Sequence, residues 1–302
     1  IARQLRKKRH RKGSISFNKT EVKFVLDKKK EPIRTKIKTA LSANKLIEEF
    51  MLLANKSVAE IFSKEKRGLY RVHDLPDDQK LIKLERIILK LGYKQNLKNP
   101  KNLNKEINSL LSKIKISPEK NLIDTLVIRS MSKAKYSTKN IGHFGLCFEK
   151  YTHFTSPIRR YPDVLVHREM EKILLKQTKK QDIEALCLHC SNREEVATKA
   201  ERASIKFMQV KYMSTKINQK FNGVISGITE RGVFVEAIDN KCEGFVKIKD
   251  VPGDYFVFNE KEMLILGRNT KEEYRLGDPV LIQVDGVNQR KQQIDFSLIE
   301  KV

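Results

Sequence analysis

Residues 153–168 read "HFTSPIRRYPDVLVHR" and mark the point at which a loop turns into a helix. Ser156 suits the N-cap of that helix, and Pro157 suits its first turn. The backbone N–H groups at such a terminus attract anions, and the guanidinium groups of Arg159 and Arg160 add planar pairs of donors. The stretch therefore predicts a phosphate site at the start of a helix.

Two other interpretations of this stretch stay open. Ion pairs with Asp163 and Glu169 would also explain the two arginines, without any ligand. Asp163 and His167 lie four residues apart on one helix face, as do His167 and Glu171, so a metal site is a second alternative. A face of solvated or hydrogen-bonded side chains is the simpler explanation of that spacing.

The chain is strongly basic, and its charge is unevenly distributed. Of 302 residues, 62 are Lys or Arg and 37 are Asp or Glu, which gives a net charge of +25. Residues 1–40 hold 15 Lys or Arg and three acidic residues, and "RKKRHRKG" at 6–13 is the densest basic run. A lysine-rich proteome would raise the charge evenly, so the uneven distribution favours a polyanionic partner. With 39% hydrophobic residues, the chain can still bury a core.

The sequence predicts a cytoplasmic protein without a membrane partner. No apolar run approaches the roughly 20 residues that span a bilayer, and no secretory signal pattern opens the chain. Four cysteines are few for this length, which is typical of a reducing compartment. Cys187 and Cys190 have CxxC spacing, but no second pair accompanies them and their segment has helical periodicity. We therefore expect no zinc or redox site there.

Periodicity predicts an α+β chain with two domains. A short hairpin over 14–39 precedes a series of helices, and period-two alternation with turn-like glycines begins at 221. We expect a mostly helical domain over 1–217 and a small β-barrel over 218–302. Ser42 is the expected N-cap of the first helix, and a second helix is expected near 77–91 with Gly92 as its C-terminal glycine. Further helices are expected near 105–114, 118–132, 158–177 and 181–215, and an extended segment at 141–150.

Several blocks of the chain together resemble the RNB exoribonucleases, the family of ribonuclease II and ribonuclease R. The stretch at 153–168 is similar to the family signature, and other similar blocks stand in the expected order. These blocks are "RKGSISFNKTEVKFVLD", "LIEEFMLLANKSVAEIF", "LYRVHDLPDDQKL", "HFGLCFEKYTHFTSPIRRYPDVLVHR" and "HCSNREEVATKAERASIKFM". The residues from 218 onward resemble the OB-fold RNA-binding module of the ribosomal S-one type, with "GVFVEAIDNKCEGFVKIKD" and "QQIDFSLIEK" most similar to the ribonuclease R branch.

The resemblance implies processive 3′→5′ hydrolysis of single-stranded RNA to 5′-mononucleotides, assisted by magnesium. It implies the C-terminal part of an RNB catalytic domain followed by a five-stranded OB-fold barrel. The family holds its metal with aspartates in a D-x-D-D-like segment, which this sequence lacks; the adjacent Asp77 and Asp78 lie at an expected helix start and suit capping. We therefore expect Mg²⁺ in the complete enzyme, no metal ligand in this chain, and a fragment or processed product, which Ile1 in place of Met also suggests.

The functional positions of the family can be matched residue by residue. Arg159 matches the arginine that lies against the scissile phosphate, where a guanidinium would stabilise charge developing on the phosphoryl oxygens. Thr155, Ser156 and Arg160 belong to the same motif and are expected to contact RNA. Glu201 in "KAERAS" matches an acid near the active site that would position the terminal nucleotide or its water. Its alternative is an i,i+4 ion pair with a helix lysine.

Two further RNA contacts are expected near the beginning of the chain. Glu48 in "LIEEF" matches an acid close to the RNA 3′ end, with Glu49 as the competing choice. Phe17 is the expected aromatic residue that stacks on bases, and an ordinary place in a strand core is its alternative.

The C-terminal module carries its own candidates. OB folds bind single strands by stacking bases on exposed aromatic side chains over a basic groove. Phe234 and Phe245 are the expected aromatic residues of the RNA face, and their alternative is the barrel core. The S-one pattern commonly has His where Lys247 stands, so we expect Lys247 to contact phosphate.

Different function classes stay open at this point. The leading hypothesis is a 3′→5′ exoribonuclease that acts as a monomer on single-stranded RNA. The rival is a catalytically silent RNA-binding protein derived from the family, because the metal-binding aspartates are absent from the sequence. A DNA-binding protein is less favoured, since single-strand modules of this type suit unstacked RNA. The sequence identifies no ribosome or RNA-decay partner.

Overall fold

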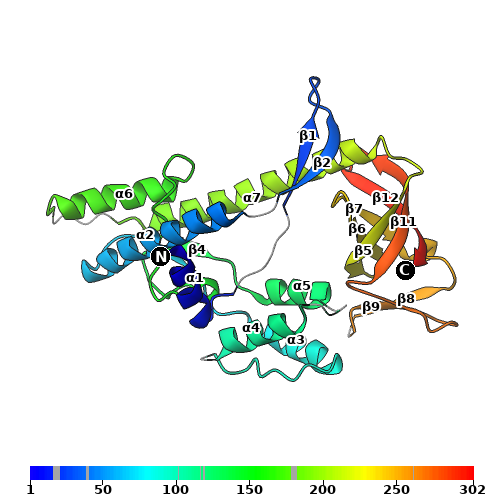
Figure 1. The fold of residues 1–302 in the computed structure, drawn as a ribbon, viewed down its shortest axis with the longest axis horizontal. Helices are drawn as coiled ribbons and strands as arrows, with labels where there is room; N and C mark the ends of the chain where they lie inside the picture. The colour runs from blue at the N-terminus through cyan, green and yellow to red at the C-terminus, as the bar shows by residue number, and fades with distance from the viewer. Residues whose placement is uncertain are drawn as a thin grey trace. The chain divides into compact units, whose positions relative to one another are not determined.

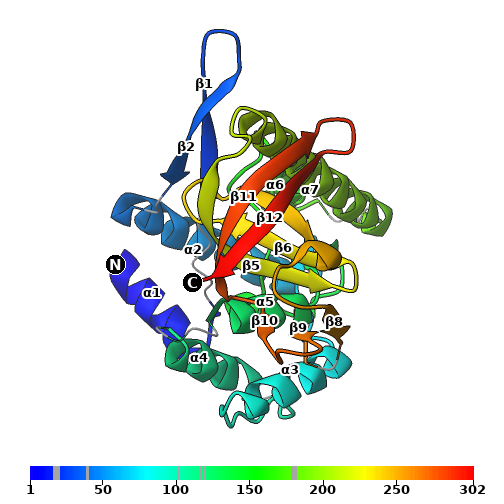
Figure 2. The ribbon, with the colours of Figure 1, turned by 90° about the vertical axis from the view of Figure 1, so that its right-hand side faces the viewer.

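The structure is a computed structural model that describes residues 1–15, 21–38, 41–100, 102–115, 117, 120–177, 182–260 and 262–302 (Figures 1 and 2). Its contacts divide the chain into two compact units. The first comprises Ile1–Asn18, Ala40–Leu110 and Val127–Lys199, and the second comprises Lys19–Thr39, Leu111–Leu126 and Ala200–Val302. The expected boundary after residue 217 stays a prediction.

The first unit is mostly helical. It contains α1, Ala2–Arg11; α2, Ser42–Lys64; α3, Asp78–Lys90; and α6, Tyr161–Leu174. Three further helices have residues in both units: α4, Leu103–Lys113; α5, Lys120–Ser130; and α7, Glu184–Met213. Two short strands, β3 (Tyr70–Val72) and β4 (Lys135–Ser137), pair antiparallel, and a 3-10 turn, η1, spans Phe144–Leu146.

The core of the first unit holds the start of α6 in place. Apolar side chains of α2, β3, β4, α6 and α7 pack together: Val58, Ala59, Phe62, Leu69, Tyr70, Val72, Tyr136, Leu165, Val166, Ile183, Cys187 and Cys190. Gly68 has φ +100, and a Cβ there would lie 2.3 Å from the ring of Phe62. The chain can therefore turn closely over that ring only with glycine. This packing fixes α2 and the start of α6, which position the candidate site.

Helix α3 follows the predicted signals closely. Asp77 is its N-cap, and the side chain accepts a hydrogen bond from the backbone N–H of Lys80 at 3.0 Å. Gly92 follows the last turn with φ +87, a conformation that glycine adopts without strain. The expectation that Asp77 caps a helix is confirmed.

Other local predictions were wrong in detail. The basic run at 6–13 was not assigned to a helix, yet most of it forms α1. The helix expected from 158 begins at Tyr161, and the segment expected to be extended at 141–150 contains η1. Ser42 is the first residue of α2 rather than its N-cap, which is Leu41.

The second unit contains a closed five-stranded barrel in the order β11-β12-β7-β6-β5, whose strands are labelled in Figure 1. Its strands are β5, Lys220–Thr229; β6, Gly232–Ala237; β7, Glu243–Lys247; β11, Pro279–Asn288; and β12, Gln293–Lys301. Buried residues alternate with more exposed ones, so that Val233, Val235 and Val246 face the core. Gly244 leaves room for Phe296, because a Cβ there would lie 2.4 Å from the phenylalanine ring.

Two smaller sheets accompany the barrel in this unit. The predicted hairpin consists of β1, Glu21–Leu26, and β2, Pro32–Lys38, which pair antiparallel. A three-stranded sheet of β8 (Phe256–Asn259), β9 (Leu264–Gly267) and β10 (Glu273–Arg275) follows a second 3-10 turn, η2 (Ile248–Asp250). The expected α+β chain with a five-stranded OB-fold barrel is thus confirmed.

Within the described residues, no helix combines the length and the apolar character that crossing a membrane requires.

Candidate nucleic-acid interface

One buried amide fastens the loop before α6 to α2. Asn55 is only 3% exposed, and its Oδ1 accepts hydrogen bonds from the backbone N–H groups of Phe154 (3.0 Å) and Thr155 (3.2 Å). Its Nδ2 donates to the hydroxyl of Tyr151 at 3.0 Å. Because an amide supplies a donor and an acceptor, this single side chain binds the backbone after His153 and the side chain of Tyr151 before it.

A buried carboxylate fixes the other end of the loop. The Oδ1 atom of Asp163 accepts hydrogen bonds from the backbone N–H of Ser156 and from Nη2 of Arg160, both at 2.8 Å. The predicted N-cap was therefore wrong: Arg160 is the N-cap of α6, and Ser156 lies in the preceding turn. The charged acceptor of Asp163 captures the Ser156 N–H, which holds this residue outside the helix. The predicted alternative of an Arg160–Asp163 ion pair is confirmed.

Arg159 differs from the other arginine of the pair. Its side chain is exposed beside the fully exposed Ile158, and it forms no ion pair with any residue that the structure describes. Glu169, the second acid considered as a partner, instead binds Arg67 at 3.1 Å and Lys172 at 2.6 Å. The guanidinium of Arg159 is thus accessible to a ligand.

Three buried polar atoms of the loop and the first turn of α6 have no hydrogen-bond partner among the described residues. They are Oγ1 of Thr155, Nε of Arg160 and Oδ2 of Asp163. Leaving a buried polar atom unpaired costs free energy, so such atoms are uncommon outside functional sites. Their clustering at the junction of the loop and α6 indicates a site that offers donors and acceptors to a polar ligand.

A cluster of aromatic and histidine side chains lies behind the loop. Oη of Tyr136 and Nδ1 of His153 are hydrogen-bonded at 2.8 Å, and the guanidinium of Arg71 stacks 4.6 Å from the centre of the Tyr136 ring. Burial, together with Arg160 and Arg71, lowers the pKa of His153 to about 2. Burial also lowers the pKa of His143 to about 3. Both imidazoles are therefore neutral at pH 7, and the positive charge of the site comes from its arginines. This cluster was not predicted from the sequence, although His153 is the first residue of the stretch at 153–168.

The two candidate glutamates of α2 have different environments. Glu49 is 3% exposed and binds the buried Arg9 at 2.5 Å. The side chain of Glu48 is 52% exposed and lies 3.4 Å from the same guanidinium. Arg9 also donates to Oγ of Ser14 at 2.8 Å. Glu49 therefore serves the packing of α1 on α2, and Glu48 is the more accessible acid.

Glu201 and Phe17 are the remaining candidates in the predicted domain over 1–217. Glu201 is exposed on α7, which is compatible with either of its two predicted roles. Phe17 lies outside the described residues. The basic residues of α1 line a cavity of about 570 Å³: Arg3, Arg6, Lys7, His10 and Arg11.

The residues that the structure describes offer no cluster of three or more His, Cys, Asp or Glu that could hold a metal ion. His167 and Glu171 are exposed on α6, whereas Asp163 is buried in its ion pair, so the three do not converge. Cys187 and Cys190 are buried free thiols, and burial raises the pKa of the Cys187 thiol to about 12. The described residues therefore do not fit a bound Mg²⁺, and the expectation that the complete enzyme uses Mg²⁺ stays a prediction.

The aromatic candidates of the barrel lie together on its outer surface. Phe234 on β6 is paired in register with Phe245 on β7, and their rings are 5.0 Å apart with a tilt of 52°. Both are partly exposed, whereas the alternating residues Val233, Val235 and Val246 are buried. Phe234 and Phe245 are thus not part of the barrel core.

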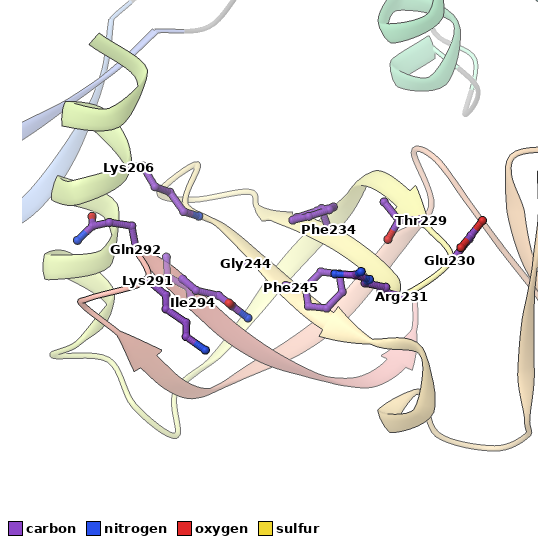
Figure 3. Close-up of a pocket in the computed structure, with 11 residues that line it drawn as sticks. Lys206, Thr229, Glu230, Arg231, Phe234, Gly244, Phe245, Lys291, Gln292 and Ile294 are labelled. Atoms are coloured by element: carbon purple, nitrogen blue, oxygen red, sulfur yellow. The ribbon is translucent and has the colours of Figure 1, made fainter. Parts of the chain in front are cut away.

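A cavity of about 640 Å³ lies over these two rings (Figure 3). Its lining includes cations from three separate segments: Lys206 on α7, Arg231 between β5 and β6, and Lys291 between β11 and β12. Nζ of Lys206 donates to the backbone carbonyl of Glu243 at 2.5 Å, and burial lowers the pKa of this lysine. The barrel therefore combines a paired aromatic surface with basic side chains, which is the combination that single-stranded nucleic acids require.

The three cations of this cavity were not among the residues predicted from the sequence. Arg231 and Lys291 each stand in a short turn between alternating strands, which is a signal that could have found them. Lys206 lies on a helix far from those turns in sequence, and its place gives no comparable signal. The predicted Lys247 is exposed and is paired in register with Gly232.

Comparisons with known proteins agree with this arrangement. The family model of the RNB domain matches residues 1–176, and that of the S1 RNA binding domain matches residues 214–299. Ribonuclease R of Aquifex aeolicus is 38% identical over 311 residues, which cover 100% of this chain and 44% of that protein. Ribonuclease R of Thermotoga maritima is 37% identical over 318 residues, with the same two coverages.

A solved structure is also similar over nearly the whole chain. Mycoplasma genitalium RNase R in complex with ribose methylated single-stranded RNA has a TM-score of 0.91 and 28% sequence identity, and the match covers 99% of this chain and 48% of that one. The chain spans less than half the length of each of these relatives. Because the RNB model matches more than half of the chain and an S1 module follows it, the chain belongs to the RNB domain family.

Proposed function

We propose that the chain is the C-terminal part of a ribonuclease R-like 3′→5′ exoribonuclease, which binds single-stranded RNA and hydrolyses it processively to 5′-mononucleotides. Similarity to ribonucleases R along the whole chain supports this function. The related structure from Mycoplasma genitalium was solved with single-stranded RNA, which supports the same class of ligand here. We further propose that the protein acts as a cytoplasmic monomer.

Arg159 is the proposed catalytic residue of this chain. Its exposed guanidinium would face the scissile phosphate and stabilise the charge that develops on the non-bridging oxygens. Thr155, Ser156 and Arg160 would contact the RNA from the loop, with Oγ1 of Thr155 and Nε of Arg160 as unused polar atoms. The fixed backbone of the loop supports this role, because electrostatic stabilisation depends on groups that are positioned beforehand.

The remaining residues would hold the strand. Glu48 and Glu201 are proposed to position the 3′-terminal nucleotide, with Glu48 favoured over the buried Glu49 by its exposure. Phe234 and Phe245 would stack on bases upstream, and Lys247 would contact phosphate. Stacking suits a processive enzyme because every base offers a flat face, so the strand can advance whatever its sequence.

Magnesium belongs to the proposal only as a cofactor of the complete enzyme. We assign no metal ligand to the described residues, since no cluster among them fits an ion. The contribution of this chain would be to bind the strand and to place Arg159 against the phosphate.

The observation that carries the proposal is the exposed guanidinium of Arg159 on a loop whose backbone is held by buried Asn55 and Asp163. The test is to incubate the complete protein with 5′-labelled single-stranded RNA and Mg²⁺, with duplex DNA as competitor. We expect loss of full-length RNA without intermediates, a short 5′ end product, and little effect of the DNA. RNA binding without hydrolysis would instead favour the catalytically silent RNA-binding protein.

A further inference from the structure

The β1–β2 hairpin carries a basic surface that belongs neither to the loop before α6 nor to the barrel cavity. The strands run side by side as a two-stranded ribbon, with Lys23 opposite Lys36 and Phe24 opposite Thr35 (Figure 1). Because side chains alternate between the faces of a strand, Lys23 and Lys36 share one face, and Phe24 lies on the other. Arg34 precedes Lys36 by two residues and so belongs to the face of the lysines.

The two faces have different surroundings within the second unit. On the apolar face, the rings of Phe24 and Tyr212 of α7 lie 6.0 Å apart. Glu31, at the start of the second strand, binds Lys211 of α7 at 2.7 Å. The hairpin therefore turns the face of Phe24 towards α7, and Lys23, Arg34 and Lys36 face away from it. All three of these cationic residues are exposed.

The pairing of Lys23 with Lys36 is unfavourable for the hairpin by itself. Side chains directly opposite each other in an antiparallel pair lie roughly 5 Å apart at Cβ, and like charges in that position destabilise the sheet. A two-stranded hairpin by itself is only marginally stable and this one relies on its packing against α7, so such repulsion adds to the cost of forming it. The described residues supply no ion pair to either lysine that would offset it. An anion bound between the two ammonium groups would remove the repulsion.

The spacing of the three charges fits a chain of phosphates. Lys36 and Arg34 are two positions apart on one strand, which separates them by about 6.7 Å, and Lys23 lies across the ribbon from Lys36. One phosphate can therefore bridge the two lysines while the next along the strand meets the guanidinium. The strands present these charges in a row along the ribbon, which suits the repeated phosphates of a backbone and not the bases.

We propose that Lys23, Arg34 and Lys36 form a phosphate-binding surface for single-stranded RNA, separate from the barrel cavity. This inference rests on the proposed function, since it takes RNA as the ligand of the chain. The surface adds contacts that carry a strong salt dependence and no sequence preference.

The decisive variant is Lys36→Glu, which replaces the repulsion by an ion pair with Lys23. Its matched control is Lys83→Glu on α3, an exposed lysine for which the net charge changes by the same amount. The measurements are the Tm of the 302-residue chain and its affinity for labelled single-stranded RNA at several salt concentrations.

We expect Lys36→Glu to keep or raise the Tm and to weaken RNA binding about tenfold more than Lys83→Glu does. The slope of log K against log salt should fall by roughly 0.7, because the one phosphate that the two lysines bridge is lost. The reciprocal variant Lys23→Glu should behave in the same way. A loss of Tm together with affinity would mean that the lysines have a structural role, and it would overturn the inference.

An equal loss of RNA affinity in Lys36→Glu and Lys83→Glu would also overturn the inference, because the affinity would then depend only on the net charge of the chain. In that case the wild-type chain still binds RNA, and Phe234→Ala still weakens binding, so the proposed function survives. A wild-type chain with no RNA affinity would refute both the proposed function and this surface.

Discussion

The loop before α6 and the outer face of the barrel are built on opposite principles. The loop is held by buried polar groups, since Asn55 and Asp163 bind its backbone N–H groups at 2.8 to 3.2 Å. The barrel face presents the rings of Phe234 and Phe245, which strand register alone brings together. The first arrangement fixes the position of a charged group, whereas the second provides an apolar surface on which bases can stack.

This difference indicates what each region can contribute to function. Electrostatic stabilisation of a transition state requires groups fixed at short distance from the reacting atoms. A small displacement of the loop therefore lowers the reaction rate strongly. Stacking on aromatic rings tolerates displacement, because the contact depends on overlapping area. Changes in the loop should therefore affect rate and folding, and changes on the barrel should affect affinity.

The largest effect is expected from Arg159→Ala in the complete protein. We expect turnover to fall by about 10²- to 10³-fold, the range observed when one charge-stabilising group is removed from an active site. RNA affinity should change by no more than about twofold, because a single exposed phosphate contact contributes little to a long strand. Single-turnover kinetics and binding titrations separate the two quantities. Arg159→Lys should retain only part of the rate, since an ammonium lacks the planar fork. A change confined to affinity would contradict the catalytic role.

A smaller effect, on stability, is expected from Asp163→Ala. The change leaves the largely buried Arg160 without its counter-charge and removes the acceptor of the Ser156 N–H. We expect the free energy of unfolding to fall by about 3 kcal/mol, as for other broken buried ion pairs. Urea unfolding measures this loss, with the exposed Glu171→Ala on the same helix as the control. An equal, small loss in both variants would show that the loop does not depend on Asp163.

Sequence patterns predicted the parts of the fold that local signals determine. Helix α3 has an aspartate N-cap and a glycine after its last turn, and both signals predicted its ends. Phe234 and Phe245 stand on segments of period-two alternation and were expected on the RNA face, and their partial exposure agrees with a place outside the barrel core. In each case the determining residues lie within a few positions of the feature.

Features determined by distant contacts could not be predicted in this way. Helix α1 has no apolar stripe, and its buried Arg9 pairs with Glu49, which lies 40 residues away. Ser156 is an ordinary N-cap by sequence, and only the position of Asp163 shows that its N–H is captured outside the helix. The barrel cavity likewise combines a helix lysine with two turn residues that no local pattern connects.

The smallest effect, and the sharpest contrast with the loop, is expected on the barrel. Phe234→Ala or Phe245→Ala should weaken binding of single-stranded RNA by about 1 to 2 kcal/mol, because each change removes a stacking surface. The slope of log K against log salt should stay unchanged, since stacking releases no counterions. Arg231→Ala should do the reverse, lowering that slope by roughly 0.7 with a smaller loss of affinity. Phe221→Ala, a phenylalanine outside the lining of the cavity, is the matched control and should leave both quantities unchanged. If the phenylalanine variants changed the slope and the arginine variant did not, the cavity would bind RNA by a mechanism other than stacking over a basic rim.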